Sequence, residues 1–272
     1  MSKWIITLVG LLFFSSSNAN FQQNISNQEL YLHGKQAYEM RCSGCHGKAG
    51  NGQGPGAVFL DPKPRDFTTG VFKFKSTPID ALPTDEDLMR ILSKGVAGTS
   101  MPAFPLVPEQ ERFAIIQYIK GFSTEWSDKE RIQSAYSGAT FPLEDFKDHG
   151  KFIERATKGR ALYVESCAVC HGQKGIGDGP GAVDLEDDWG NPIKPADISK
   201  KTIKSGKSVK DIYRVILSGI GGTPMPSFKD AYSDEELWDL AAFILYLRGK
   251  ANDHYGDKDY VKPISKEEVG EE

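Results

Sequence analysis

The strongest constraint on the fold of this chain is a repeat of seventeen residues. The segment CSGCHGKAGNGQGPGAV at 42–58 recurs as CAVCHGQKGIGDGPGAV at 167–183, with eleven identical positions and an offset of 125 residues. Self-similarity at one fixed offset indicates a duplicated unit, and 272 residues leave room for two domains of ordinary size. The repeat therefore predicts two copies of one fold and two copies of one site.

Each unit carries the sequence signals of several helices. Ser26-x-x-Glu29, Thr84-x-x-Asp87 and Ser233-x-x-Glu236 have the spacing of capping boxes at helix starts. Apolar residues recur at helical spacing in 83–95, 207–219, 108–121 and 233–249. The Pro-rich segments 60–70 and 191–201 lack sustained alternation and are predicted to be loops. These patterns together predict an all-α fold.

The remaining segments suggest how the domains are arranged. In residues 1–19, Lys3 is followed by a short apolar run and then by small polar residues. This pattern predicts a signal peptide cleaved near Ala19. The alternative is an uncleaved membrane anchor, for which the run is short. We expect domains at 26–124 and 150–250, a linker at 125–149 and an acidic tail at 251–272.

The two Cys-x-x-Cys-His motifs have a specific covalent use. Two thiols spaced by two residues add across the two vinyl groups of haem, and the adjacent histidine ligates the iron. A zinc site would need a fourth ligand, and a thioredoxin-like pair belongs in a βαβ unit. The predicted cofactors are therefore two covalently bound haem c groups, one held by Cys42, Cys45 and His46 and the other by Cys167, Cys170 and His171.

A second repeated motif supplies a candidate for the sixth iron ligand. GTSMPAF at 98–104 recurs as GTPMPSF at 222–228, which places Met101 and Met225 at the same position of each unit. A thioether is a soft ligand that raises the reduction potential, whereas most isolated methionines pack in a core. Recurrence in register favours ligation. No such recurrence exists for the remaining histidines, His33, His149 and His254, which are expected on the surface or in local hydrogen bonds.

The glycine-rich runs admit a phosphate-binding interpretation, but neither has the G-x-x-x-x-G-K-[ST] pattern. We expect the glycines to bring the backbone close to a flat macrocycle through positive φ angles. They are Gly50, Gly52, Gly54 and Gly56, with Gly175, Gly177, Gly179 and Gly181. Tyr118 and Tyr246 stand at matched places in the closing stretches and are expected to pack in the core or against haem.

Taken together, CSGCHG with TSMPAF and CAVCHG with TPMPSF resemble the di-haem class I cytochromes c. The resemblance covers almost all of the mature chain and implies two fused helical domains, each enclosing one haem with His/Met-ligated iron. It also implies electron transfer in the bacterial periplasm. Segment 62–88 resembles cytochromes that accompany respiratory oxidoreductases, and the second unit departs from it at 195–208. That departure suggests that the two haem edges face different partners.

The leading functional hypothesis is an electron carrier, or the cytochrome subunit of a respiratory enzyme, that is not itself an enzyme. Its partners would be redox proteins such as a respiratory oxidoreductase or a terminal oxidase. Two alternatives stay open: a di-haem peroxidase or sulfur-compound oxidoreductase with a displaceable axial ligand, and a docking module in which haem only supports the fold.

Charge gives less specific information about partners. A net charge of −4 without a large basic surface argues against nucleic acid, and nothing in the sequence requires membrane association. Five lysines nevertheless fall within eleven residues, namely Lys200, Lys201, Lys204, Lys207 and Lys210. They form either a solvated surface or a site that steers an acidic redox partner.

Overall fold

The computed structural model of the chain describes residues 26–128, 142–200 and 203–252. The predicted signal peptide and nearly all of the predicted acidic tail lie outside these ranges. Within them the chain is helical and forms no β-strand, which confirms the all-α prediction. None of the described helices combines the length and the apolar character needed to cross a bilayer.

The two domains have matching element orders. The first contains α1 (Asn27–Arg41), α2 (Ser43–His46), η1 (Ala57–Phe59), α3 (Asp85–Lys94), α4 (Glu109–Lys120) and η2 (Thr124–Ser127). The second contains α5 (Leu143–Lys147), α6 (His149–Ser166), α7 (Ala168–His171), η4 (Pro180–Ala182), α8 (Val209–Ser218) and α9 (Asp234–Asn252). Apart from α5 and η2, each element of one domain has a counterpart in the other.

The predicted helix starts are found where the sequence placed them. Ser26 and Thr84 form complete capping boxes with Glu29 and Asp87, and Ser233 exchanges hydrogen bonds with Glu236 at the start of α9. One predicted end is wrong, because α9 continues past Gly249 to Asn252. Gly249 does not adopt a positive φ angle, and glycine within a helix costs only about 1 kcal/mol.

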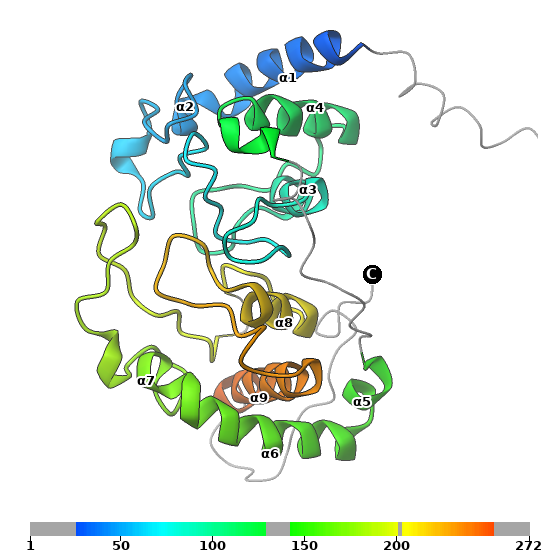
Figure 1. Cartoon of the computed structure of the whole chain (residues 1–272), viewed down its shortest axis with the longest axis vertical. Helices are drawn as coiled ribbons and strands as arrows, with labels where there is room; N and C mark the ends of the chain where they lie inside the picture. The colour runs from blue at the N-terminus through cyan, green and yellow to red at the C-terminus, as the bar shows by residue number, and fades with distance from the viewer. Residues whose placement is uncertain (1–25, 129–141, 201–202, 253–272) are drawn as a thin grey trace, which may run out of the picture.

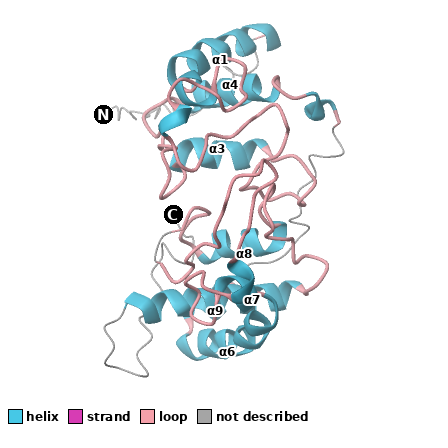
Figure 2. Cartoon of the chain, turned by 90° about the vertical axis from the view of Figure 1, so that its left-hand side faces the viewer, coloured by secondary structure: helices cyan, strands magenta, loops and turns pink. Residues whose placement is uncertain are grey.

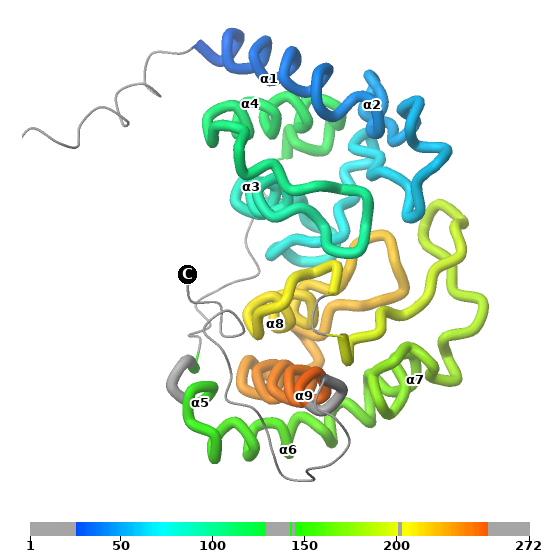
Figure 3. The backbone as a smooth tube through the Cα atoms, turned by 180° about the vertical axis from the view of Figure 1, so that it is seen from behind, coloured from blue at the N-terminus to red at the C-terminus, as the bar shows by residue number. Residues whose placement is uncertain are grey.

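The helices stack in a mirrored order along the long axis of the molecule. Figure 1 shows α1, α4 and α3 in the upper half, followed by α8, α9 and α6 in the lower half. The short helices α2 and α7 lie on one side of the stack in that view, and Figure 3 shows the same arrangement from behind. In Figure 2, long loops fill much of the space between α3 and α8. The two cysteine motifs therefore lie on the same side of the molecule.

In each domain the first long helix crosses the last at a glycine. Helix α1 packs on α4 and α6 packs on α9. A Cβ atom on Gly34 would overlap the carbonyl oxygen of Ala114, and one on Gly159 would overlap that of Asp239. Backbone therefore touches backbone at both crossings, which brings the helices closer than any side chain would allow.

Two hydrophobic cores surround these crossings. The first includes Tyr38, Leu92 and Ile116, and the second includes Tyr163, Ile216 and Trp238. The segment predicted to be a linker takes part in both cores at its ends. Trp126 packs edge-on against Phe72 of the first core, and Phe146, which is 1% exposed, belongs to the second.

The aromatic pairing corrects one alignment made from the sequence. Tyr38 of α1 contacts Tyr118 with ring centroids 5.2 Å apart. The equivalent Tyr163 of α6 contacts Phe243 at 5.0 Å. Tyr118 therefore corresponds to Phe243, and the prediction that Tyr246 is its counterpart is wrong. The closing helices carry several aromatic residues, and only the helix crossing fixes which of them faces inward.

A loop of the first domain packs into the second. Ser218 at the end of α8 donates its hydroxyl to the Lys75 carbonyl at 3.0 Å, and a Cβ atom on Gly221 would lie 2.6 Å from the carbonyl oxygen of Phe72. Lys75 is 2% exposed, and its ammonium donates to the carbonyls of Ile79 and Ala81 at 2.9 and 2.6 Å. This loop lies in the segment where the two repeats diverge.

The helix crossing makes a direct prediction about stability. Gly159→Ala forces α6 and α9 apart, and overpacking of this kind costs about 1–3 kcal/mol. The measurement is chemical denaturation of the full chain with haem bound. Gly249→Ala is the matched control on α9, because a Cβ atom there meets nothing within 4 Å. Equal stability of the two variants would contradict the close crossing.

Candidate functional site

The first cysteine motif is attached directly to the end of α1. The amide of Cys42 donates to the Tyr38 carbonyl at 2.8 Å and closes the last turn. The Tyr38 hydroxyl in turn donates to the carbonyl of Gly47, just after the motif, at 2.7 Å. Cys42 is buried and Cys45 is partly buried, and both thiols are free of disulfides. The helix crossing therefore also determines where the two thiols lie.

The motif histidine is held in a single tautomer. Nδ1 of His46 lies 3.0 Å from the carbonyl oxygen of Arg65. Because a carbonyl only accepts, Nδ1 carries the proton and Nε2 keeps a free lone pair. Burial lowers the pKa of His46, which favours the neutral ring at neutral pH. Phe67 stacks on that ring with centroids 4.5 Å apart. His46 is thus prepared to act as a metal ligand through Nε2.

The glycine-rich run wraps around the motif. Only some of its glycines have the positive φ angles predicted from the sequence. Gly50 and Gly52 have positive φ angles, as predicted, but Gly54 and Gly56 do not. Gly54 is needed for space, since a Cβ atom on it would lie 2.5 Å from the Gly44 carbonyl oxygen. Its amide donates to the Cys45 carbonyl at 3.0 Å. The second run behaves in the same way at Gly175, Gly177, Gly179 and Gly181.

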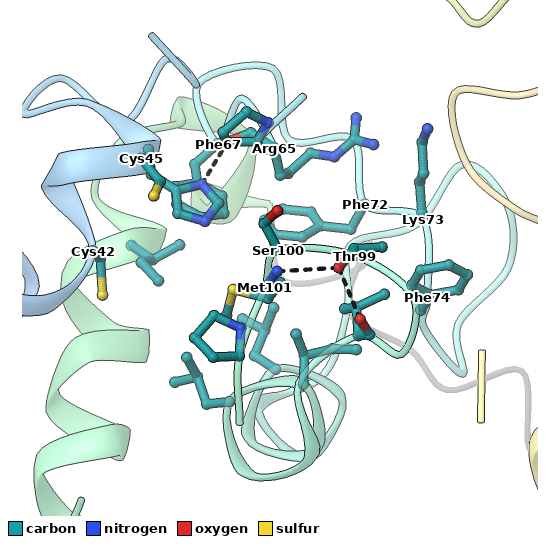
Figure 4. A pocket seen from close by; sticks show the side chains of 18 of the residues that line it. Cys42, Cys45, Arg65, Phe67, Phe72, Lys73, Phe74, Thr99, Ser100 and Met101 are labelled. Atoms are coloured by element: carbon teal, nitrogen blue, oxygen red, sulfur yellow. Dashed lines mark hydrogen bonds between the residues drawn. The ribbon is translucent and has the colours of Figure 1, made fainter. Parts of the chain in front are cut away.

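A cavity of about 340 Å³ connects the motif to the methionine loop. Cys42, Cys45, His46 and Met101 all line it, together with apolar side chains from α3 and α4. In Figure 4 the two cysteines lie on one side, and Met101 approaches from a separate loop. The volume falls in the range of small-molecule and cofactor sites. The first four predicted site residues are therefore brought together.

Hydrogen bonds within the methionine loop and to α3 hold the loop in place. The amide of Met101 donates to the Thr99 hydroxyl at 3.1 Å, and the Met101 carbonyl accepts from the amide of Val96 at 3.1 Å. The amide of Phe104 then donates to the Leu92 carbonyl of α3 at 2.8 Å. The threonine two residues before the methionine thus fixes the turn that presents the thioether.

The second domain repeats the hydrogen bonds of this site, although Ile198 stands where Phe67 stacks on His46. Nδ1 of His171 lies 3.0 Å from the Ala196 carbonyl oxygen, and the Tyr163 hydroxyl donates to Gly172 at 2.7 Å. The Met225 amide lies 3.3 Å from the Thr223 hydroxyl. Burial raises the pKa of the Cys167 thiol to about 12, as it raises that of Cys42 to about 11. Cys170 is partly buried, like Cys45. The local architecture of the motifs is therefore duplicated.

The other candidate ligands lie elsewhere. His33 and His149 are exposed on their helices, and His254 lies outside the described residues. Within the described ranges, no group of three or more His, Cys, Asp or Glu side chains is arranged to hold a metal ion.

Five cationic side chains line the first cavity, and the sequence did not predict any of them as a site residue. They are Arg41, Lys63, Arg65, Lys73 and Lys204. Among them, only Lys204 belongs to the cluster of five lysines at 200–210. The sequence feature that could have revealed Arg65, Lys73 and Lys204 is the divergence of the two repeats between 64–76 and 195–208.

Comparison with known proteins agrees with this geometry. Residues 31–123 match the family model described as cytochrome c, and residues 154–244 match that of cytochrome c oxidase, cbb3-type, subunit III. A solved chain of the Kuenenia stuttgartiensis reducing HAO-like protein complex Kustc0457/Kustc0458 is 38% identical, with a TM-score of 0.72. The match covers 79% of this chain and 95% of that one. The chain belongs to the cytochrome c family. It has the two domains of a di-haem class I cytochrome c, and no curated protein matches it.

The site of this cytochrome suits haem c. The cavity offers two free thiols, a neutral imidazole with Nε2 available, and a thioether. Its walls are largely apolar, which fits a macrocycle and limits the access of water to iron. The family therefore identifies an electron-transfer cytochrome that binds haem c, and the geometry of the first domain is compatible with it.

The close contact of Gly54 with the first motif leads to a prediction about stability and haem attachment. Gly54→Ala pushes the run away from the Cys42–His46 turn, and the overpacking costs about 1–3 kcal/mol. We expect a lower thermal midpoint and less covalently bound haem at that motif. Gly44→Ala, within the motif itself, is the control because its Cβ atom meets nothing within 4 Å. Unchanged haem content and stability in Gly54→Ala would refute the close contact.

Proposed function

We propose that this cytochrome carries two covalent haems in the periplasm and passes single electrons between partner proteins, as the cytochrome subunit of an oxidoreductase complex. The observation that supports it best is the duplicated hydrogen bonding of histidine and methionine. In both domains a carbonyl fixes Nδ1 of the motif histidine, and a threonine hydroxyl fixes the amide of the methionine. Two motifs with the same local hydrogen bonds in one chain suit passage of electrons from one to the next.

Each residue in these sites has a distinct role in the proposal. The thiols of Cys42 and Cys45, and of Cys167 and Cys170, bind the two haems covalently. His46 and Met101 would hold the haem iron in the first domain, and His171 and Met225 would hold it in the second. Haem iron supplies reversible one-electron chemistry. The carbonyls on Nδ1 orient the imidazoles, and the threonines orient the thioethers.

Several features favour a carrier over an enzyme. Catalysis at haem requires an open axial position and a polar distal pocket. The Met101 loop is instead tied by hydrogen bonds within itself and to α3, and apolar side chains of α3, including Leu88 and Leu92, line the cavity. Rigid ligation also suits electron transfer, because little rearrangement accompanies the change of oxidation state.

The similarity to a known complex suggests the class of partner. The related solved chain comes from a reducing HAO-like protein complex and is matched over 95% of its length. We infer that this cytochrome assembles with an oxidoreductase of that HAO-like class. Export to the periplasm rests on the predicted signal peptide at 1–19. The experiment that identifies the partner is co-purification of the native cytochrome with its complex.

The proposed ligands predict separate effects on two reduction potentials. Met101→Ala removes a soft ligand that favours ferrous iron, so the potential of the first haem falls, by on the order of 0.1 V within the span of about 0.8 V that axial ligands set. Met225→Ala does the same to the second haem. Spectroelectrochemical titration of each variant measures both.

Mass spectrometry of the same samples gives the necessary control. The wild-type chain and both methionine variants should each carry the mass of two haems. If neither substitution changes a spectrum or a potential, the sixth ligands lie elsewhere. A wild-type chain without two haems would contradict the proposed cofactor content directly.

A kinetic experiment separates the carrier from the peroxidase-like alternative. With methionine bound to both irons, we expect poor binding of carbon monoxide by the reduced protein and negligible peroxide turnover by the fully or half-reduced protein. Stopped-flow reduction by a redox partner should remain rapid and should slow as salt rises, because charge guides the encounter. Rapid peroxide turnover, or a high-spin haem in the half-reduced state, would favour the enzyme instead.

A further inference from the structure

Charged and aromatic side chains of the two domains meet beside the first cavity. Arg65 and Lys73 come from the first domain, and the second contributes Asp187, Trp189 and Lys204. The Arg65 guanidinium carbon lies 4.4 Å from the centroid of the Trp189 ring, and Nζ of Lys73 lies 3.7 Å from Oδ2 of Asp187. Figure 4 shows Arg65 and Lys73 extending to the same side, away from Cys42 and Cys45. Arg65, Lys73 and Lys204 line the cavity, so its wall includes side chains of both domains, and Trp189 and Asp187 contact two of these cations.

Asp187 is a fixed negative charge in this group. Its Oδ1 accepts hydrogen bonds from the amide of Trp189 at 3.1 Å and from the amide and side-chain nitrogen of Asn191, each at 3.0 Å. Its side chain is only 8% exposed. Burial by itself raises the pKa of Asp187, but the hydrogen bonds from Asn191 and Trp189 and the charge of Lys73 outweigh it and lower the pKa. The carboxylate is thus charged at neutral pH.

The loop that carries Asp187 is fixed against both domains. The amide of Asp188 donates to the Gly222 carbonyl at 3.2 Å. A Cβ atom on Gly222 would lie 2.6 Å from the Trp189 ring and 3.2 Å from Val71 of the first domain. Trp189 is therefore held between Gly222 on one side and Arg65 on another, and the position of Asp187 follows from that packing.

This group of side chains is specific to the first site, because the two repeats differ at the position of Arg65. Arg65 and Ala196 are equivalent, since their carbonyls accept the same hydrogen bond from His46 and His171. The second domain thus has a methyl group where the first has a guanidinium. Within the described residues, the Arg65 guanidinium stacks on Trp189 and forms no ion pair or hydrogen bond. It is available to the carboxylate side chains that haem carries.

We propose that the second domain completes the first haem site and that the negative charge of Asp187, held beside the cavity-lining Lys73, lowers the reduction potential of the first haem. The inference rests on the proposed function, in which the first haem occupies this cavity. Reduction adds one negative charge to the haem, so nearby cations favour it and a nearby carboxylate opposes it. Arg65 and Asp187 therefore act in opposite directions on the potential of the first haem, whose cavity Arg65 lines, and we expect the larger shift at that haem.

Two substitutions test this by spectroelectrochemical titration of the full chain with both haems bound. Asp187→Asn keeps the hydrogen-bond acceptor and removes the charge, so the potential of the first haem rises. Arg65→Ala copies the residue of the second domain, so that potential falls. We expect each to change the equilibrium between the oxidised and reduced first haem by about threefold to tenfold, where tenfold is about 59 mV for one electron. Met101→Ala identifies which component of the titration is the first haem.

Glu186→Gln is the matched control, because it removes one charge from the same loop at an exposed position. It should leave both potentials unchanged. If Asp187→Asn leaves the first potential unchanged, or shifts both haems equally, the inference is wrong even though both haems are bound. A wild-type chain lacking haem at Cys42 and Cys45 would instead refute the proposed function, so the two failures are distinguishable by mass spectrometry.

Discussion

Contact of backbone with backbone at Gly34 and Gly159 is the feature on which the rest of each domain depends. A side chain at either position would separate the first and last long helices, and the cysteine motif follows directly from the first of them. Tyr38 then links that helix to the residue after the motif histidine through its hydroxyl. Helix packing, thiol position and histidine orientation are thus consequences of a single close approach.

The duplicated chain has not remained symmetric. The local contacts around the histidines and methionines recur almost unchanged, which suits two sites that perform the same chemistry. The surroundings differ, because Arg65 in the first domain is replaced by Ala196 in the second. A loop of the first domain also packs against the second through Ser218 and Gly221. Duplication therefore supplies two similar centres, and divergence of the connecting loops gives them different electrostatic environments.

Much of the fold could be predicted from short-range signals. Capping boxes, such as that of Thr84, act within one helical turn and mark helix starts correctly. Two predictions were wrong, one because a single glycine costs a helix only about 1 kcal/mol and the other because tertiary contact decides the outcome. Gly249 does not end its helix, and Tyr118 corresponds to Phe243 and not to Tyr246. Several aromatic residues satisfy the same periodicity, and only the partner helix selects the one that is buried.

The sequence by itself determined the two domains, their helical class and the recurring cysteine, histidine and methionine residues, because each is encoded by local spacing or by repetition. Only the tertiary structure placed Met101 in the same cavity as His46, and only it placed Asp187 beside Lys73. These residues lie far apart along the chain. Their proximity depends on how helices and domains pack, and no local pattern specifies that packing.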